Sequence, residues 1–553
     1  MDKNALIAVM ISLAIWVGWQ KYYLEPYQQH AVVEQQVQEA ARKASLQQEQ
    51  NKANIDSIGF APKNILAAQG KLSIGKQTPV SSASLETDSY QMKLTNGPSL
   101  FDGWVLKNYY QSLQHKGDTI NLKLVSGFNE QLRLRIAEEN FTAFNESNWS
   151  DFSKTGKNSY TAHIQGPEIS AERSVEAVDG SYYTNVNYRI KFANTPPKFI
   201  FFDLLGSPKR ENDKEGSVFG QQPDKVKFTY RDTNSRQSVM AASLKETQES
   251  FAGIKWLGLD TKYFTMAIVP DKSLRNDSGI QIKHEYYQGN PVVRGSFVVP
   301  TNGKKEIEIP LRVYFGPKQL ESLEKADSIL SDAIDFGWTS AIAIPLLKAL
   351  KWLYGFFGNY GIAIMVLTFI IKIILFPLMY KSMTSTAKMA KLQPQLNALR
   401  EKYKDDKEKL NTEMMSFMKT NGYNPAGGCL PMLLQMPIFF ALYRVFFNSI
   451  ELYQAPFFAW IHDLSSPDPL FIAPVLLAGL MFVQQKISPA TVTDPAQQKM
   501  MQFMPVMFGV FMLLLPAGLN MYMLVNSATT IMQQYLLNKK LGLGKFAKPV
   551  GAA

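Results

Sequence analysis

The sequence predicts a polytopic α-helical membrane protein with six transmembrane helices, five of them in a C-terminal core, and a large extracytoplasmic β-sandwich domain. Three observations predict this class. An apolar segment at residues 5–19 approaches the ~20 residues that cross a bilayer. Five more apolar segments follow residue 360. Between them lies a mostly polar stretch of short runs that alternate apolar and polar residues, as strands do.

Composition excludes several function classes. The 553 residues carry a formal net charge of +11, but the basic residues form no aromatic-interleaved or finger motif, so anionic lipid is a better partner than DNA. The single cysteine, Cys429, excludes an intramolecular disulfide and a cysteine cluster for a metal. The five histidines form no HExxH pair, and neither a GxxxxGK[ST] loop nor a GxSxG elbow is present. We therefore predict a non-enzymatic protein without catalytic residues, metal or cofactor.

The N-terminal part is predicted to hold the chain at the membrane. Residues 1–24 are interpreted as a transmembrane signal anchor, because no A-x-A cleavage site follows the apolar run; a cleaved signal peptide is the alternative. Residues 25–57 are rich in Gln, Ala, Glu and Lys and lack a repeated apolar stripe. They are expected to form a flexible polar tether.

Residues 58–320 are predicted to form the β domain. Alternating runs begin at Tyr90, Thr119, Tyr183, Ser296 and Ile307, separated by Gly, Pro, Asn and Asp. The length is at the upper end for one sandwich, so a single double-length fold and two domains are both open.

Residues 321–359 are predicted to be a linker followed by an amphipathic helix. Five apolar residues recur at helical spacing, while Lys348 and Lys351 fall away from that stripe; the five are Leu346, Leu350, Leu353, Tyr354 and Phe357. This pattern is typical of a helix in the membrane interface. An ordinary packing helix is the alternative.

Residues 360–538 are predicted to form the five-helix core. The apolar segments lie at about 360–380, 430–448, 470–486, 503–516 and 518–537. Nine Lys and Arg residues fall in 381–419 and none in 449–469, which places the first loop in the cytoplasm. The same rule places the tail at 539–553, and with six spans the N-terminus, in the cytoplasm, and the β domain outside it.

The basic loop at 381–421 is predicted to be a cytoplasmic helical hairpin, with helices at about 388–402 and 404–419. Eighteen of the 23 methionines lie after residue 360, and their flexible thioethers suit varied apolar partners, although gap filling between helices explains them equally well. The candidate contact residues of the hairpin are Lys388, Lys391, Arg400, Lys402, Met414 and Met418.

Polar residues inside the apolar segments mark the candidate site. Lys372 lies near the middle of the second span, where a charge costs about 2.5–3.5 kcal/mol on insertion scales. Thr368 lies one turn earlier. Polar residues at helical spacing in the last span are Tyr522, Asn526, Thr529 or Thr530, and Gln533.

If the second and last spans face each other, these side chains line a wet cavity whose cation needs an anion. The anion would be a substrate carboxylate or a lipid headgroup, and water filling the cavity is the remaining option. A Lys372 that snorkels to the interface is the alternative. Gln435 adds a polar group from the third span. Arg444, near the outer end of that span, is interpreted as an interface anchor.

The C-terminal two hundred residues resemble the YidC/Oxa-type membrane protein insertase family, and the whole chain resembles its Gram-negative bacterial branch. The resemblance rests on the motifs NPAGGCLPMLLQMPIFFALY at 424–443, QAPF at 454–457, WIHDL at 460–464, SPATVTDP at 488–495 and QFMP at 502–505. The order of anchor, tether, β domain and five spans is also that of the family.

This resemblance implies a periplasmic β-supersandwich and a hydrophilic groove open to the cytoplasm and to lipid. It implies insertion and folding of nascent membrane proteins in the bacterial inner membrane, alone or with the Sec translocon. The further partners it implies are the ribosome, signal recognition pathway components and membrane lipids. Clients or the ribosome would meet the candidate contact residues of the hairpin. The family's groove cation falls on Lys372, its threonine on Thr368 and its tyrosine on Tyr522. Relatives usually carry arginine at the first position, so this chain keeps the charge but loses the planar five-donor fork.

Two rival functions remain open from the residues alone. A small-molecule or ion transporter would use Lys372 as its anion site, but the five core spans show neither an internal repeat nor paired broken helices. A structural assembly chaperone would do its work with the β domain.

Overall fold

The computed structural model describes most of the chain after residue 80. The described residues are 81–111, 118–208, 226–241, 244, 247–250, 253–287, 290–403, 406–421, 426–487 and 495–541. They belong to one compact unit, Leu72–Ala553. The predicted signal anchor at 1–24, the tether at 25–57 and most of the tail at 539–553 lie outside the described residues.

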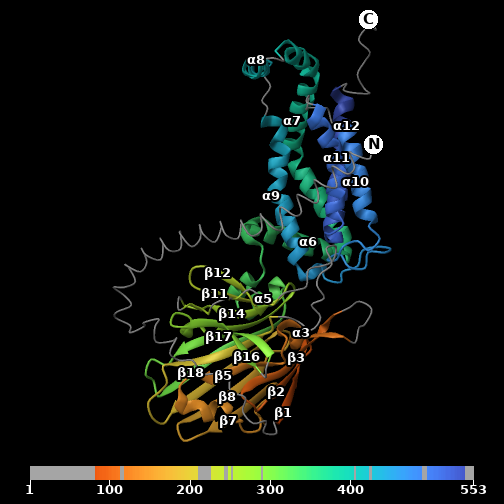
Figure 1. Ribbon diagram of the computed structural model, residues 1–553. Coiled ribbons are helices and arrows are strands. Elements are labelled where there is room, and N and C mark those ends of the chain that lie inside the picture. The colour runs from red at the N-terminus through yellow and green to blue at the C-terminus, as the bar shows by residue number, and fades with distance from the viewer. Residues whose placement is uncertain are drawn as a thin grey trace. The chain divides into compact units, whose positions relative to one another are not determined.

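The β domain consists of two antiparallel sheets, each with nine described strands (Figure 1). In order across the first sheet the strands are β1 Ser82–Glu86, β2 Tyr90–Thr95, β3 Ser99–Tyr110, β5 Glu130–Ile136, β10 Phe199–Gly206, β17 Asn290–Pro300, β16 Gly279–Tyr287 and β13 Gln248–Ser250, with β4 Thr119–Asn121 paired to β3. In order across the second they are β12 Arg236–Met240, β11 Lys227–Arg231, β14 Trp256–Asp260, β15 Phe264–Pro270, β18 Glu306–Pro317, β9 Tyr183–Phe192, β8 Ile169–Ala177, β7 Ser159–Gln165 and β6 Ser153–Lys154.

One hydrophobic core joins the two sheets. Side chains on β8 and β9 alternate between buried and less buried positions, as the sequence alternation predicts. Trp104 of the first sheet packs edge-on against Phe315 of the second, with ring centroids 5.7 Å apart. Both belong to a single buried cluster that draws on the two sheets along their length. Among the described residues the β domain is therefore one double-length sandwich rather than two domains.

The run that begins at Thr119 differs from the prediction of one strand. Only β4 is extended, and a short helix, α3 Leu122–Ser126, follows at once. The side chain of Asn121 accepts a hydrogen bond from the Leu124 amide, and Gly127 ends the helix in the left-handed region at φ 88°. These are the preferred N-terminal and C-terminal caps of a helix, so local capping overrides the alternating pattern.

Asp203 is a fully buried carboxylate at the centre of the first sheet. Arg135 Nε donates to it at 2.7 Å and Ser296 Oγ donates to it at 2.6 Å. Arg294, also fully buried, lies 3.8 Å away. Burial alone would raise the pKa of Asp203, but the charges of Arg135 and Arg294 outweigh it and lower the pKa to about 2.

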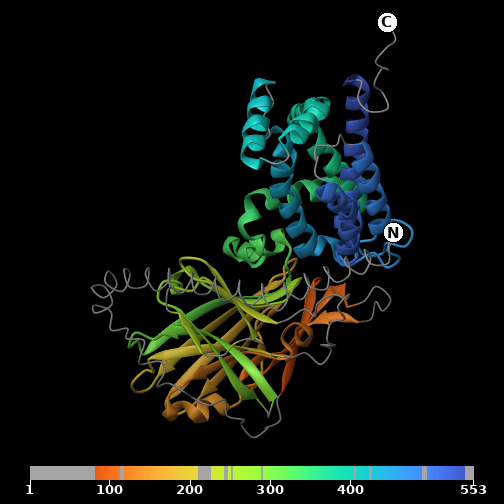
Figure 2. The ribbon, with the colours of Figure 1, turned by 45° about the horizontal axis from the view of Figure 1, so that its top comes forward.

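The helices after the β domain complete the described fold. Short elements are α4 Thr142–Glu146, α5 Leu320–Ala326 and the 3₁₀ turns η3 Glu139–Phe141, η5 Lys272–Leu274, η6 Ser328–Ala333, η7 Gly337–Thr339 and η8 Ile450–Leu452. The long ones are α6 Ser340–Phe357, α7 Tyr360–Lys402, α8 Lys407–Thr420, α9 Ala426–Asn448, α10 Ile472–Ile487, α11 Pro495–Met512 and α12 Ala517–Leu541. In Figures 1 and 2, α7 and α9–α12 run alongside one another as a bundle.

Helix α7 corrects the expected boundary between span and hairpin. The prediction separated an apolar span from a hairpin helix beginning near residue 388, whereas α7 runs without a break for 43 residues, through Pro377 and Pro394. At 1.5 Å per residue it is about 65 Å long, twice the ~30 Å of a hydrocarbon core. The hairpin arm is thus a rigid extension of the helix that carries Lys372, and α8 folds back beside it (Figure 2).

Helix α6 has a buried stripe that differs in part from the predicted one. Ala343, Leu347, Leu350 and Leu353 are buried, but the predicted members Tyr354 and Phe357 are exposed. Lys351, expected to face away, forms ion pairs with Glu321 of α5 and, at 3.4 Å, with Glu451 of η8. The helix therefore packs through one face and also exposes large apolar side chains, notably Trp352 and Phe356.

Within the described residues, two helices are long and apolar enough to cross a membrane by length and hydropathy: Gly337–Phe357 and Tyr360–Ser385. Two further apolar helices, Ile472–Ile487 and Gln502–Met512, are shorter. The number of six spans stays a prediction.

Replacement of Asp203 by Ala should destabilise the β domain. It leaves two buried arginines without their shared carboxylate, and breaking such an arrangement costs about 3–5 kcal/mol. In the parent protein, the lowered pKa means that Asp203 stabilises the fold above about pH 4, and this contribution is lost as the pH falls toward 2. Thermal unfolding of the full chain in detergent, followed by circular dichroism at pH 7 and pH 3, measures both effects. An unchanged melting temperature of D203A at pH 7 would contradict the prediction.

Candidate functional site

The candidate site lies where α7 and α12 pack together inside the apolar bundle. Lys372 is only 4% exposed, and its Nζ donates a hydrogen bond of 2.8 Å to Thr530 Oγ1 of α12. The second and last apolar spans, whose contact was the condition for a shared polar site, thus lie side by side in the structure. Lys372 does not snorkel along its helix to an end, because its ammonium is held by the neighbouring helix.

Lys372 makes no ion pair with any described residue, and its contact with Thr530 is the single hydrogen bond of its ammonium there. The Thr530 hydroxyl in turn donates a hydrogen bond of 2.7 Å to the backbone carbonyl of Asn526. An ammonium has three N–H donors, so two of them find no protein acceptor in the described part of the chain. Burying a cation with one neutral partner costs folding free energy. Lys372 therefore does not stabilise the bundle by its packing alone.

The polar stripe of α12 continues on both sides of Thr530. Asn526 and Gln533 lie about one turn away on the same helical face. Asn526 Oδ1 and Gln533 Oε1 are buried and accept no hydrogen bond from the described protein. Buried acceptors without partners cost about 1–3 kcal/mol each unless water or a ligand satisfies them. Together with Lys372 they form a chain of unsatisfied polar groups, which we call the α7–α12 polar face.

A second polar contact joins α9 to α12. Gln435 Nε2 donates a hydrogen bond to the hydroxyl of Tyr522, whose side chain is 1% exposed. Two of the residues expected to line the site are therefore in contact, and each is the hydrogen-bond partner of the other. Tyr522 also packs against Phe446 of α9, with ring centroids 6.3 Å apart.

Thr368, expected beside Lys372 on the polar face, is turned to its own helix. Its hydroxyl donates 2.7 Å to the carbonyl of Ile364, and its side chain is 2% exposed. A buried threonine inside an apolar helix commonly satisfies its hydroxyl in this way. Thr529, the alternative to Thr530 in the sequence pattern, likewise bonds back to Val525 at 2.7 Å. The hydroxyl at the ammonium is that of Thr530.

Polar residues that the sequence pattern missed tie the last helix to its neighbours. Gln534 Nε2 donates to Asn538 Oδ1 at 2.9 Å, and Asn538 Nδ2 donates to the carbonyl of Ile487 at the end of α10. Asn520, fully buried, donates to the carbonyl of Met512 at the end of α11. The i, i+4 spacing of Gln534 and Asn538 was a signal available in the sequence.

Two aspartates fix the backbone conformation of the segment that follows α9. Asp463 accepts hydrogen bonds from the amides of Gln454 and Ser465, at 3.0 and 2.8 Å. Asp468 accepts a hydrogen bond of 2.9 Å from Trp460 Nε1. It also accepts a hydrogen bond from the amide of Ala473 at the start of α10. The QAPF and WIHDL motifs are therefore built into a capped turn that fixes the entry of α10.

The hairpin residues predicted to meet clients or the ribosome are only partly described. Nothing is described of the side chains of Lys388 and Lys391. Arg400 is half-buried, and Lys402 is exposed with its Nζ 5.2 Å from the ring centre of Tyr403. Met414 and Met418 are half-buried, whereas Met415 is 60% exposed. Their role stays a prediction.

Comparison with known proteins decides the family. A model described as "YidC periplasmic domain" matches residues 82–349, and one described as "60Kd inner membrane protein" matches residues 352–543. "Membrane protein insertase YidC" from Lawsonia intracellularis is 30% identical over 560 residues, which cover 98% of this chain and 99% of the relative. The chain belongs to the YidC family. The YidC insertase from Geotalea uraniireducens is 39% identical over 369 residues, covering 65% of this chain and 68% of the relative.

A solved YidC structure, "Active YidC insertase crystal structure with the first transmembrane domain resolved", is 16% identical with a TM-score of 0.36, covering 88% of this chain and 99% of that chain. The two YidC family models meet between residues 349 and 352, inside α6. The β domain described above is thus the YidC periplasmic domain, and the α7–α12 polar face lies in the part of the chain that matches the inner membrane protein.

Replacement of Lys372 by Met should stabilise the folded protein. Methionine has a similar volume and removes a buried cation that has one neutral partner, so we expect a gain of about 2 kcal/mol. The measurement is the thermal unfolding of purified full-length protein in detergent, with Thr530→Val as the matched control at the other end of the hydrogen bond. A melting temperature of K372M clearly below that of the parent would show that Lys372 is paired and structural.

Proposed function

We propose that this protein inserts membrane proteins into the bacterial inner membrane by offering a hydrated polar face at the junction of α7 and α12. The observation that carries the proposal is the buried Lys372, held by one hydroxyl and flanked by the unsatisfied oxygens of Asn526 and Gln533. Water in the same place satisfies these groups in the resting protein. A nascent client's polar or acidic outer segment then replaces this water, in a groove open to the cytoplasm and to lipid.

The short helices α10 and α11 support the second half of this mechanism. Their 16 and 18 residues are about 24 and 27 Å long, less than the ~30 Å of a hydrocarbon core. Their outer faces expose Val475, Leu476, Val506 and Met507 by 53% or more. A bilayer thinned beside such helices shortens the apolar path that a client's polar segment must cross. The client's apolar segment leaves sideways, driven by its own burial in lipid.

The finer placement follows the positive-inside rule. We propose six spans, with both termini and the α7–α8 hairpin in the cytoplasm and the β-supersandwich in the periplasm. The exposed Met415 and the basic hairpin receive nascent chains there, together with ribosome and signal recognition pathway components. Insertion proceeds alone or beside the Sec translocon, without a catalytic step.

Insertion in a reconstituted system tests this function. A single-span client with an acidic outer tail is offered to liposomes that contain the purified full chain, and protease protection scores insertion. We expect the parent and Lys372→Arg to insert the client and Lys372→Ala to lose at least about tenfold, because the groove then lacks its cation. Equal insertion by all three would leave an insertase in which Lys372 plays no part in client transfer.

A deletion separates the insertase from a chaperone that acts through its β domain. Removal of residues 58–320 should leave most of the insertion activity, because the α7–α12 polar face and the hairpin lie outside that range. The matched control is Tyr453→Ala, since the Tyr453 hydroxyl donates to the carbonyl of Tyr110 in the β domain at 2.8 Å. If the deletion abolishes insertion while the control does not, the β domain itself handles the client.

A further inference from the structure

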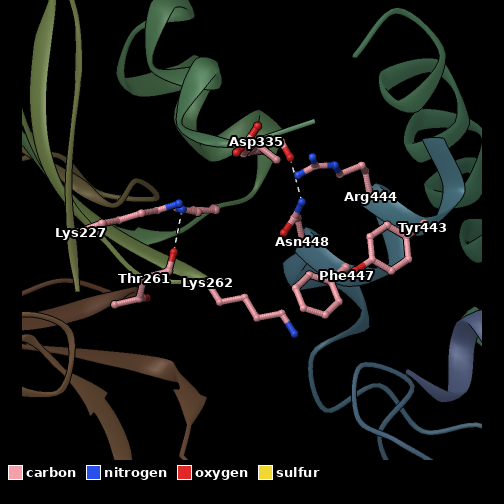
Figure 3. Close-up of a pocket in the computed structure, with 10 residues that line it drawn as sticks. Lys227, Thr261, Lys262, Asp335, Tyr443, Arg444, Phe447 and Asn448 are labelled. Atoms are coloured by element: carbon pink, nitrogen blue, oxygen red, sulfur yellow. Dashed lines mark hydrogen bonds between the residues drawn. The ribbon is translucent and has the colours of Figure 1, made fainter. Parts of the chain in front are cut away.

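A basic cavity lies where the β domain meets the end of α9. Its volume is about 330 Å³ (Figure 3). Four cationic side chains and one carboxylate line it, together with the ring of Phe447; the charged residues are Lys227, Lys262, Lys318, Arg444 and Asp335. In Figure 3, Lys227 and Lys262 approach from the β domain, whereas Arg444 and Phe447 approach from α9.

The carboxylates at the cavity already have partners. Asp260, buried behind the wall, forms an ion pair with Lys318 at 2.9 Å, and Lys318 Nζ also donates 2.7 Å to the Thr261 carbonyl. Asp335 lies 3.4 Å from Arg236. Burial alone would raise the pKa of Asp335, but the charges of Arg236 and Arg444 outweigh it and hold the pKa below its ordinary value. Both carboxylates are thus already engaged by basic side chains of the protein.

Two of the cations, Lys227 and Arg444, act on Asp335 through their charge but make no direct contact with a carboxylate of the described residues. Within the described residues, neither Lys227 nor Arg444 forms an ion pair. Lys262 places its Nζ 4.1 Å from the ring centre of Phe447, so its charge is also held at the cavity. An Arg fork and two flexible ammonium groups around a small cavity are the donor set that binds phosphate.

The cavity also lies at the end of an apolar helix with exposed aromatic rings. Arg444 and Phe447 belong to the last two turns of α9, which ends at Asn448. Trp338 of η7 is 73% exposed, and its ring centroid lies 6.1 Å from that of Phe440, which belongs to α9. Aromatic side chains of this kind mark the headgroup level of a membrane helix, where basic side chains meet the phosphates of lipids and form charge-assisted hydrogen bonds with them.

We propose that this cavity binds the phosphate of an anionic phospholipid headgroup, with Arg444 and Lys227 as its principal ligands. The inference rests on the proposed placement of α9 across the membrane, but not on insertion activity. A phosphoglycerol headgroup fits the volume, while its acyl chains lie along the exposed apolar face of α9. The lipid then bridges the β domain and the core at a junction where the protein alone leaves positive charge unbalanced.

Lipid-dependent stabilisation of the purified full chain tests the proposal. Phosphatidylglycerol or phosphatidylethanolamine is titrated into the detergent-solubilised protein, and the melting temperature is recorded. We expect phosphatidylglycerol to raise it saturably and more than phosphatidylethanolamine does. In Lys227→Gln/Arg444→Gln the apparent affinity should fall about tenfold or more, because two charge-assisted contacts are lost. The control Lys272→Gln/Lys304→Gln removes the same charge from exposed positions of the β domain and should respond as the parent does.

Two further arms distinguish the source of the anion and guard against misfolding. Inorganic phosphate or glycerol phosphate that stabilises the parent as much as the lipid would overturn the proposal in favour of a soluble ligand. An acidic peptide that stabilises it where phosphatidylglycerol does not would overturn it in favour of a client segment. Equal response of the parent and the double variant would also overturn it. If the double variant does not fold, Lys227→Gln alone replaces it, with the same expected loss of affinity for phosphatidylglycerol. Native mass spectrometry of the parent with each lipid should then show more bound phosphatidylglycerol than phosphatidylethanolamine, and equal binding would overturn the proposal.

Discussion

The buried cation of Lys372 constrains the packing of the helical bundle. Lys372 sits among apolar helices with one hydroxyl partner, and the cost of keeping it there must be offset by the surrounding packing and by water. The long helix α7 holds the lysine on a rigid rod, and α12 supplies Thr530 and the two unsatisfied oxygens beside it. Contacts of Asn520 and Asn538 fix α12 against α11 and α10, so the polar face keeps its position.

Much of the β domain follows from local sequence. Alternation predicts β9 and β18 because each apolar side chain must face the shared core, and a one-residue slip would bury Arg189 instead of Ile190. The strand predicted to begin at Thr119 is wrong after Asn121, because Asn121 and Gly127 cap a short helix that periodicity alone does not reveal. The joining of two sheets into one sandwich depends on contacts such as Trp104 to Phe315, which are 211 positions apart in the chain and invisible to pattern analysis.

For the candidate site, the sequence predicts the helices and the residue types but not the pairings. The apolar span around Lys372 and the polar spacing of the last helix identify both polar faces, but whether the two faces meet is only a condition at the level of the sequence. Which hydroxyl meets the ammonium is decided by rotation and tilt: Thr530 does, while Thr368 bonds back to its own helix. Likewise the sequence identifies Arg444 as an interface anchor but does not reveal that it lines a cavity together with residues of the β domain. Such choices depend on packing between elements rather than on period.

Water is expected to occupy the α7–α12 polar face, and measuring hydration at single positions tests this most directly. With Cys429 replaced by Ser, a spin label is placed at Asn526 or, as the lipid-facing control, at Met532, which is 51% exposed on the same helix. Deuterium modulation from heavy water and relaxation by oxygen are then measured in lipid nanodiscs. Hydration predicts strong deuterium modulation at 526 and strong oxygen relaxation at 532. A label at 526 that is as dry as the one at 532 would contradict the hydrated face and the insertion mechanism built on it.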